Sequence, residues 1–194
     1  MKLKNFHIKN IKSIKDSGVC HLSDNITILA GQNESGKSAV LEALKYFSRG
    51  MDNNFEKYSI RLNGDVPYVE CCFSLCDEND CNYKDENISI VLKELKEIQC
   101  YREGKSEIKF SSNTIDKLYE IILKLIEKNK VVNIVDVDID SSLDDDPKKV
   151  IIENFIKELE ETVLKYLPKF DYYSSFENIL PDKISISEIE KMKQ

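Results

Sequence analysis

The chain has 194 residues, of which 41% are hydrophobic and 32% are charged, and this balance is typical of a soluble globular protein. Its 28 Lys and Arg residues stand against 35 Asp and Glu residues, and the net charge of −7 argues against a segment that binds nucleic acid by itself. No apolar run approaches the ~20 residues that a membrane span requires, and the N-terminus has no apolar secretory segment. We therefore expect a cytoplasmic protein with no membrane contact.

The first 30 residues predict three strands. Residues 3–22 alternate imperfectly between apolar and polar side chains, and residues 16–18 (Asp-Ser-Gly) have the composition of a turn between two strands. Residues 26–30 form a β-rich apolar run, which is typical of a buried strand. We expect a strand pair, followed by a buried strand that leads into the next motif.

A glycine-rich phosphate loop follows the third predicted strand. The Walker A pattern G-x₄-G-K-[S/T] is complete in Gly31, Gln32, Asn33, Glu34, Ser35, Gly36, Lys37 and Ser38. In such a loop, backbone N–H groups and the following helix N-terminus surround a phosphate. Lys37 is expected to reach the β- and γ-phosphates, and Ser38 to offer its hydroxyl to Mg²⁺. These residues, with Ala39 after them, predict a site for ATP and Mg²⁺.

An amphipathic helix is predicted directly after the loop. Glu42 and Lys45 fall on its polar face, and Gly50 is placed to form its C-cap. Its predicted apolar face consists of Val40, Leu41, Ala43, Leu44 and Phe47. A strand before the loop and a helix after it form the structural context that a phosphate loop requires.

The middle of the chain predicts a small antiparallel sheet. Its strand candidates are residues 66–75, 88–95 and 98–110, which turn-rich stretches separate. The cysteines at 71, 72, 76 and 81 cluster there, but they form no paired C-x₂-C motif. We interpret Cys71 and Cys72 as small hydrophobic residues of a strand rather than as zinc ligands.

Two helices and a strand are predicted in the last third of the chain. Residues 114–128 have apolar side chains at helical spacing, with Thr114 as the N-cap. Pro147, after Asp146, is a favoured first helical residue for a helix that runs to about residue 166. A strand is expected at residues 169–173, and a short helix begins near residue 187. The acidic stretch 136–146 fails the EF-hand pattern and is interpreted as a solvated loop.

The phosphate loop and its surroundings resemble those of the SMC/RecF/OLD branch of the ABC-type ATPases. The phrase at residues 8–14 (IKNIKSI), the loop asparagine Asn33 and the phrase at residues 40–44 (VLEAL) carry this resemblance. It covers roughly residues 1–48 and implies an α/β P-loop NTPase fold, with a mixed sheet around the P-loop helix, an antiparallel β-subdomain and further helices. In this branch a basic residue at the place of Lys12 approaches the phosphates. The alternative for Lys12 is an exposed lysine of a basic strand.

Within the branch, the chain most resembles the OLD family of ATP-dependent endonucleases. These proteins have an N-terminal ATPase and a C-terminal Toprim nuclease domain. The resemblance implies a homodimer driven by ATP, action on DNA in repair or phage defence, and nuclease chemistry outside this chain. It divides one ATPase domain into residues 1–50 with the strands, loop and helix, 51–112 with the β-subdomain, and 113–194 with a helical insertion and a return strand.

The parts of an ABC-type ATPase that complete hydrolysis are expected beyond residue 194. No glycine after Lys37 lies in an LSGG-like signature, and residues 132–136 mimic a Walker B strand but place Val137 where the catalytic glutamate belongs. Residues 173–176 lie where a glutamine-bearing loop is expected, yet they contain no glutamine. We therefore expect no catalytic residue in this chain, which by itself would bind ATP and hydrolyse it poorly.

Two other functions remain open. The chain could belong to a RecF- or SMC-like DNA-repair or clamp ATPase without a nuclease, and a coiled coil in the whole gene, rather than a Toprim domain, would indicate this. A complete small P-loop kinase needs lid arginines, whereas this sequence contains only Arg49, Arg61 and Arg102.

Overall fold

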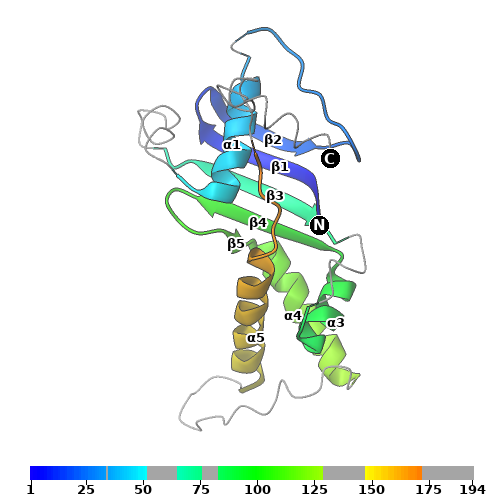
Figure 1. The fold of residues 1–194 in the computed structure, drawn as a ribbon. Helices are drawn as coiled ribbons and strands as arrows, with labels where there is room; N and C mark the ends of the chain where they lie inside the picture. The colour runs from blue at the N-terminus through cyan, green and yellow to red at the C-terminus, as the bar shows by residue number, and fades with distance from the viewer. Residues whose placement is uncertain (34, 52–64, 76–82, 129–146, 172–194) are drawn as a thin grey trace, which may run out of the picture.

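The computed structural model describes residues 1–33, 35–51, 65–75, 83–128 and 147–171 (Figure 1). These residues form one antiparallel five-stranded sheet of order β2-β1-β3-β4-β5. The strands are β1 (Lys2–Ile11), β2 (Ile14–His21), β3 (Tyr68–Ser74), β4 (Glu97–Glu103) and β5 (Lys109–Phe110). The helices are α1 (Lys37–Arg49), α3 (Glu86–Leu95), α4 (Ser112–Glu127) and α5 (Pro147–Leu164).

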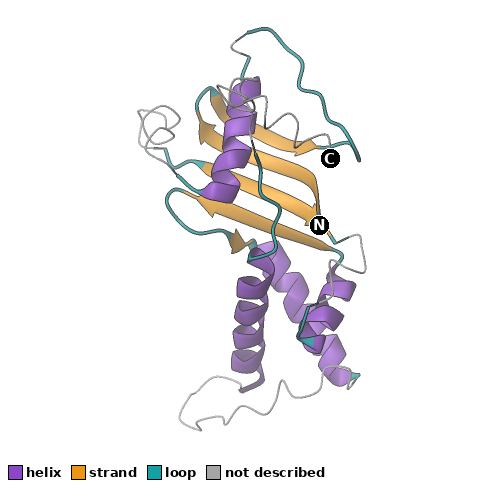
Figure 2. Ribbon diagram, in the orientation of Figure 1, coloured by secondary structure: helices purple, strands orange, loops and turns teal. Residues whose placement is uncertain are grey.

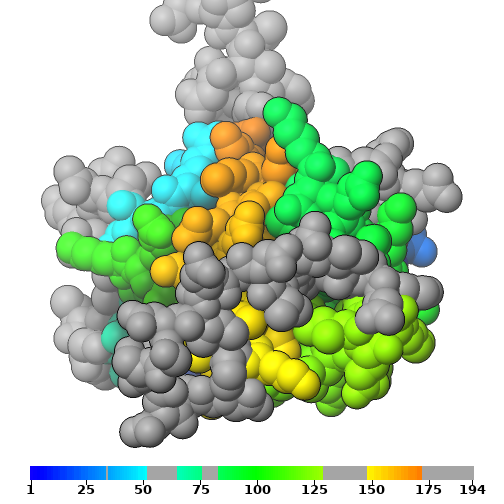
Figure 3. All heavy atoms as spheres, turned by 90° about the horizontal axis from the view of Figure 1, so that it is seen from below, coloured from blue at the N-terminus to red at the C-terminus, as the bar shows by residue number. Residues whose placement is uncertain are grey.

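The helices cover different parts of the sheet. Helix α1 crosses one face, whereas α3, α4 and α5 gather beyond the β4–β5 end (Figure 2). Seen from the helical end, the start of α5 (yellow) lies beside α4, and the segment after α5 (orange) lies beside α1 (Figure 3). Phe170 in that segment stacks on Phe73 of β3 and contacts Phe47 of α1. This packing closes the core between α1 and the sheet.

The β1–β2 turn does not lie where the sequence pattern placed it. The strands turn at Lys12 and Ser13, whereas residues 16–18 lie inside β2. There the register shifts between His7 and Lys9, and the Asp16 carboxylate accepts a hydrogen bond from the Gly18 N–H. Turn-forming residues therefore make a bulge within the strand rather than the turn.

Residues 26–30 do not form the predicted buried strand. They have no strand assignment, and the exposed fractions of Ile26 and Ile28 are 77% and 83%. An apolar run becomes a buried strand only where other elements pair with it and cover it. Within the described residues, the phosphate loop is therefore preceded by an exposed apolar segment, and the sheet beside α1 is antiparallel rather than mixed.

The predicted strands of the middle region are partly correct. Strand β3 confirms the first, and the third divides into β4 and β5. Residues 88–95, however, belong to helix α3, because Ile88, Val91, Leu92 and Leu95 recur at helical spacing and all are buried. The Asp85 side chain caps this helix by accepting hydrogen bonds from two backbone N–H groups. Strands β3, β4 and β5 join β1 and β2 in one sheet.

The two later helices are confirmed as α4 and α5, with one correction. The N-cap of α4 is Ser111 rather than Thr114, because the Ser111 hydroxyl accepts from the Thr114 N–H. The Thr114 hydroxyl instead bonds both the N–H and the carbonyl of Gln99 in β4. Residues 169–171 form no strand. The Walker B-like stretch at 132–136, the acidic loop, residues 173–176 and the helix near 187 lie outside the described residues.

The strand cysteines are part of the core. Cys71 of β3 lies opposite Cys100 of β4, both are free and fully buried, and burial raises the pKa of each thiol. The interpretation of Cys71 and Cys72 as small hydrophobic residues is confirmed. Cys76 and Cys81 lie outside the described residues, and within those that are described no group of His, Cys, Asp or Glu is arranged to hold a metal. In the same part of the chain, no helix is long and apolar enough to cross a membrane.

Candidate nucleotide-binding site

The phosphate loop ends in a helix N-terminus that no side chain of the described residues caps. Gly36 is the N-cap of α1, with a φ of 93° that a residue with a side chain rarely adopts. Its carbonyl accepts the first helical bond from the Val40 N–H. No side-chain cap bonds the first N–H groups of α1, whereas Asp85 and Ser111 cap α3 and α4. The N-terminus of α1 therefore offers uncompensated N–H groups to an anion.

Lys37 folds back over the loop. Its Nζ donates hydrogen bonds to the Gly31 carbonyl at 2.8 Å and to the Gln32 carbonyl at 2.6 Å, with the Ser35 hydroxyl at 3.4 Å. A β-carbon at Gly31 would lie 2.6 Å from the Ser35 hydroxyl oxygen, so any larger residue there would require the Ser35 side chain to move. The ammonium thus lies on the loop rather than in the core.

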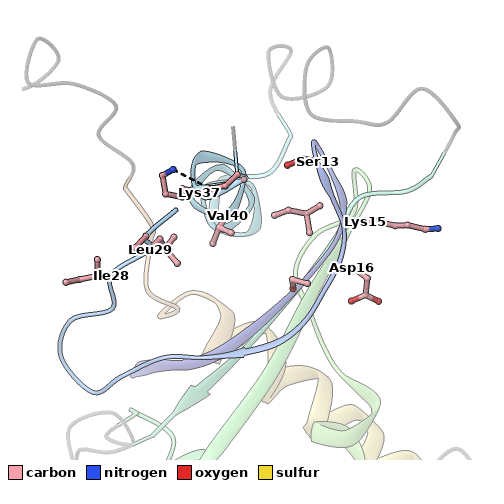
Figure 4. A pocket seen from close by; sticks show the side chains of 12 residues that line it. Ser13, Lys15, Asp16, Ile28, Leu29, Lys37 and Val40 are labelled. Atoms are coloured by element: carbon pink, nitrogen blue, oxygen red, sulfur yellow. Dashed lines mark hydrogen bonds between the residues drawn. The ribbon is translucent and has the colours of Figure 1, made fainter. Parts of the chain in front are cut away.

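Two cavities meet at Lys37. The larger, of about 740 Å³, lies between residues 28–30 on one side and the start of β2 on the other, with Val40 at its base (Figure 4). The smaller cavity, of about 280 Å³, is lined by more polar groups, since two lysines and two serines border it. It is lined by Lys12, Ser13, Asn33, Gly36, Lys37, Ser38 and Ala39.

The smaller cavity unites most of the residues that the sequence predicted for the nucleotide. Lys12, far from the loop in sequence, lies beside it in the structure because the β1–β2 turn packs against Gly36. Ser35 lines the larger cavity, and Gly31 and Gln32 contact Lys37 through their carbonyl groups. Glu34 lies outside the described residues.

Two residues of the site were not predicted from the sequence. Ser13 lines both cavities, and a β-carbon at Gly36 would lie 3.3 Å from its hydroxyl oxygen. The Glu42 carboxylate lies 2.5 Å from the Lys12 ammonium. Glu42 lies one helical turn after Ser38, and this spacing places it near the phosphate loop. Its partner Lys12 could not be predicted, because the β1–β2 turn was expected at residues 16–18 rather than at Lys12 and Ser13.

The β2 wall of the larger cavity contains the carboxylate of Asp16. The Gly18 N–H, and after it the hydrogen bond from His7, hold the pKa of Asp16 below its usual range. The His7 Nε2 lies 2.6 Å from the Asp16 Oδ1, and Lys9 lies on the same side of the strand pair. In Figure 4 the labelled Asp16 and Lys15 lie across the cavity from Ile28 and Leu29. This cavity is therefore apolar on one side and polar on the other.

The C-terminal end of α1 is anchored to the sheet. The Tyr46 hydroxyl donates to the Gly104 carbonyl at 2.6 Å, and the Arg102 Nε donates to the Phe47 carbonyl at 2.8 Å. Burial raises the pKa of Tyr46 to about 12 and lowers the pKa of Arg102. Gly50 caps the helix as predicted, but Leu41, expected on the buried face, is exposed. These contacts hold the helix, and so the loop, in a defined place on the sheet.

Comparisons with known proteins address the class of this site. The model of the family described as AAA ATPase domain matches residues 1–191. The DNA replication and repair protein RecF of Shewanella woodyi is 29% identical over 119 residues, which are 61% of this chain and 29% of that protein. The chain therefore spans less than a third of the length of this curated relative.

A solved structure from work on ATP-driven dimerization and DNA stimulated activation of SMC ATPases matches the fold of this chain weakly. It matches 80% of this chain and 99% of its own, with 15% sequence identity and a TM-score of 0.41. A TM-score this low carries no argument about function.

Proposed function

Because the chain belongs to the AAA ATPase domain family, we propose that its phosphate loop binds ATP together with Mg²⁺, as the nucleotide-binding lobe of an ABC/SMC-like ATPase. The observation that carries this proposal is the smaller cavity at the uncapped N-terminus of α1, where Lys12, Lys37 and Ser38 meet. Two ammonium groups and free backbone N–H groups suit a polyphosphate, which is strongly anionic.

Each group has a distinct part in binding. Lys37 would exchange its bonds to the loop carbonyls of Gly31 and Gln32 for phosphate oxygens. The exposed Ser38 hydroxyl would ligate Mg²⁺, which neutralises phosphate charge when bound. Lys12 would add a second ammonium from the β1–β2 turn. Ala39 is buried and would fix the start of the helix rather than contact phosphate through its side chain.

The proposal extends to the whole protein. Its remaining ATPase parts would pack against the exposed apolar segment at residues 26–30, and ATP would drive the dimerisation of two such proteins. As in the OLD family, a C-terminal nuclease domain would then act on DNA. The resemblance at residues 8–14 and around Asn33 supports this form of the proposal.

A second candidate is a RecF- or SMC-like DNA-repair ATPase without a nuclease. The identity with the RecF protein of Shewanella woodyi favours this alternative, since RecF is named for DNA replication and repair. Both candidates share the nucleotide site and differ only in the rest of the protein.

Calorimetric titration tests the shared part of the proposal. The chain is titrated with ATP in the presence of Mg²⁺ and, in parallel, with adenosine, which has no phosphate. We expect saturable binding of ATP and much weaker binding of adenosine, because phosphate contacts would supply most of the affinity. Failure to bind ATP, or equal affinity for the two ligands, would contradict the proposal.

A further inference from the structure

Glu42 joins the phosphate-loop helix to the β1–β2 turn. Its Oε2 lies 2.5 Å from the Nζ of Lys12, and the two side chains are 27% and 30% exposed. Resting on the proposed function, we propose that Glu42 is a positioning residue for polyphosphate: it holds the Lys12 ammonium at the mouth of the phosphate loop. Glu42 itself would not contact the ligand.

The lining of the smaller cavity shows that Lys12, and not Glu42, borders the space where a ligand would lie. Lys12 lines this cavity together with Lys37 and Ser38, whereas Glu42 does not. Glu42 follows Ser38 by one helical turn, so its carboxylate approaches Lys12 from the side of the helix. Glu42 is therefore placed to act on a ligand in the cavity through its ion pair with Lys12 rather than by contact.

Lys12 needs a partner to keep one position. Its side chain is a flexible four-carbon stem, which loses conformational entropy when the ammonium is held in place. The backbone of Lys12 has a φ of 50°, and the following Ser13 packs against Gly36, so the turn is placed beside the loop. The backbone thus brings the side chain near the cavity, and the bond to Glu42 selects the direction in which the ammonium points.

Charge balance favours the same role. Lys12 and Lys37 line one small cavity, and two like charges so placed repel each other. The Glu42 carboxylate compensates one of them while leaving both ammonium groups beside the cavity. The pair is also less exposed than Glu120–Lys124 on α4, where the side chains are 73% and 67% exposed and 3.6 Å apart. Solvent therefore screens the Glu42–Lys12 interaction less.

A double-mutant cycle tests the proposal. Glu42→Gln, Lys12→Met and the double variant are titrated with ATP-Mg²⁺ and with tripolyphosphate, and Glu120→Gln is the matched control. We expect Glu42→Gln to weaken the binding of both ligands about fivefold, as for the loss of a moderate ion pair. In the Lys12→Met background the same change is expected to have no effect, and Glu120→Gln none in either.

The other outcomes are equally informative. Tighter binding by Glu42→Gln would show that the carboxylate competes with phosphate for Lys12 and would overturn the proposal. An unchanged affinity, or equal losses with and without Lys12, would also overturn it, since Glu42 would then not act through Lys12. If the wild-type chain binds neither ATP nor tripolyphosphate, the proposed function itself fails, and this inference fails with it.

Discussion

The hydroxyl of Tyr46 donates a hydrogen bond of 2.6 Å to the carbonyl of Gly104, 58 residues later in the chain. Tyr46 is buried on the inner face of α1, and Gly104 follows directly after β4. A second hydrogen bond runs from the Arg102 Nε to the Phe47 carbonyl. The two bonds tie the helix of the phosphate loop to β4 and to the residue that follows it. The position of the loop therefore depends on contacts a full helix length away from it.

Removing that hydrogen bond is expected to destabilise the fold. In Tyr46→Phe the partly buried Gly104 carbonyl loses its donor while the ring still fills its place, so the free energy of unfolding should fall by about 1 kcal/mol. Urea unfolding followed by circular dichroism measures this. Tyr166→Phe is the control, because Tyr166 is exposed. Equal stability of the wild type and Tyr46→Phe would show that the bond contributes nothing.

The stability of the chain is expected to fall in alkaline solution. Burial raises the pKa of Tyr46 to about 12, above its ordinary value near 10, so the folded state keeps a proton that the unfolded state loses. The contribution is complete below about pH 10 and is lost as the pH rises toward 12. Urea unfolding at pH 8, 10 and 11 should show this decline, and Tyr46→Phe should show a shallower one. Parallel declines would exclude Tyr46 as a source.

Lys37→Ala is expected to abolish nucleotide binding without unfolding the domain. Within the described part of the chain, the Lys37 ammonium hydrogen-bonds only loop atoms, namely the carbonyls of Gly31 and Gln32 and the Ser35 hydroxyl, so the core keeps its contacts in the variant. Titration with ATP-Mg²⁺ measures the affinity, and thermal unfolding checks the fold. Lys124→Ala on α4 is the matched control, since this lysine is exposed and lies outside both cavities. Equal affinity of wild type and Lys37→Ala would remove Lys37 from the site.

The isolated chain is expected to show little steady-state ATP hydrolysis. Its sequence has no signature loop, and Val137 stands where a Walker B strand would carry its glutamate. Asp136→Asn should consequently leave the affinity for ATP unchanged. Release of phosphate at a fixed chain concentration measures turnover. Robust hydrolysis that Asp136→Asn abolishes would identify Asp136 as a catalytic-site residue and refute the expectation.

The chain alone is expected to stay monomeric with ATP, whereas the whole protein should dimerise. In ABC-type ATPases each γ-phosphate lies between the loop of one subunit and the signature of the other, and ATP shifts a population only by its differential affinity for the two states. The net charge of −7 further opposes self-association, weakly at physiological salt. Light scattering with and without ATP-Mg²⁺ distinguishes these outcomes. An ATP-dependent dimer of the chain alone would indicate a signature element within it.

Local patterns in the sequence were sufficient for the elements whose signals lie within a few residues. The spacing of Gly31, Gly36 and Lys37 indicated the phosphate loop, helical periodicity identified α1 and α4, and Pro147 after Asp146 identified the start of α5. These predictions succeeded because a helix satisfies its own backbone hydrogen bonds, so its residues alone carry the evidence. The strand predicted at residues 88–95 was wrong, because a short apolar run fits a buried strand as well as a helix. The signal that distinguishes the two is Asp85, a favoured N-cap residue just before the run.

Contacts between distant segments were decided only by the tertiary structure. Residues 26–30 have the composition of a buried strand, yet whether they are covered depends on elements elsewhere. The Lys12–Glu42 pair, the approach of Ser13 to Gly36 and the Tyr46–Gly104 bond each join residues more than 20 positions apart. No local pattern encodes such pairs, because their distances follow from how the sheet registers and how α1 packs on it. The sequence by itself thus determined the place of the phosphate-loop motif and of the helix after it, whereas the fold decided which charged side chains surround that loop.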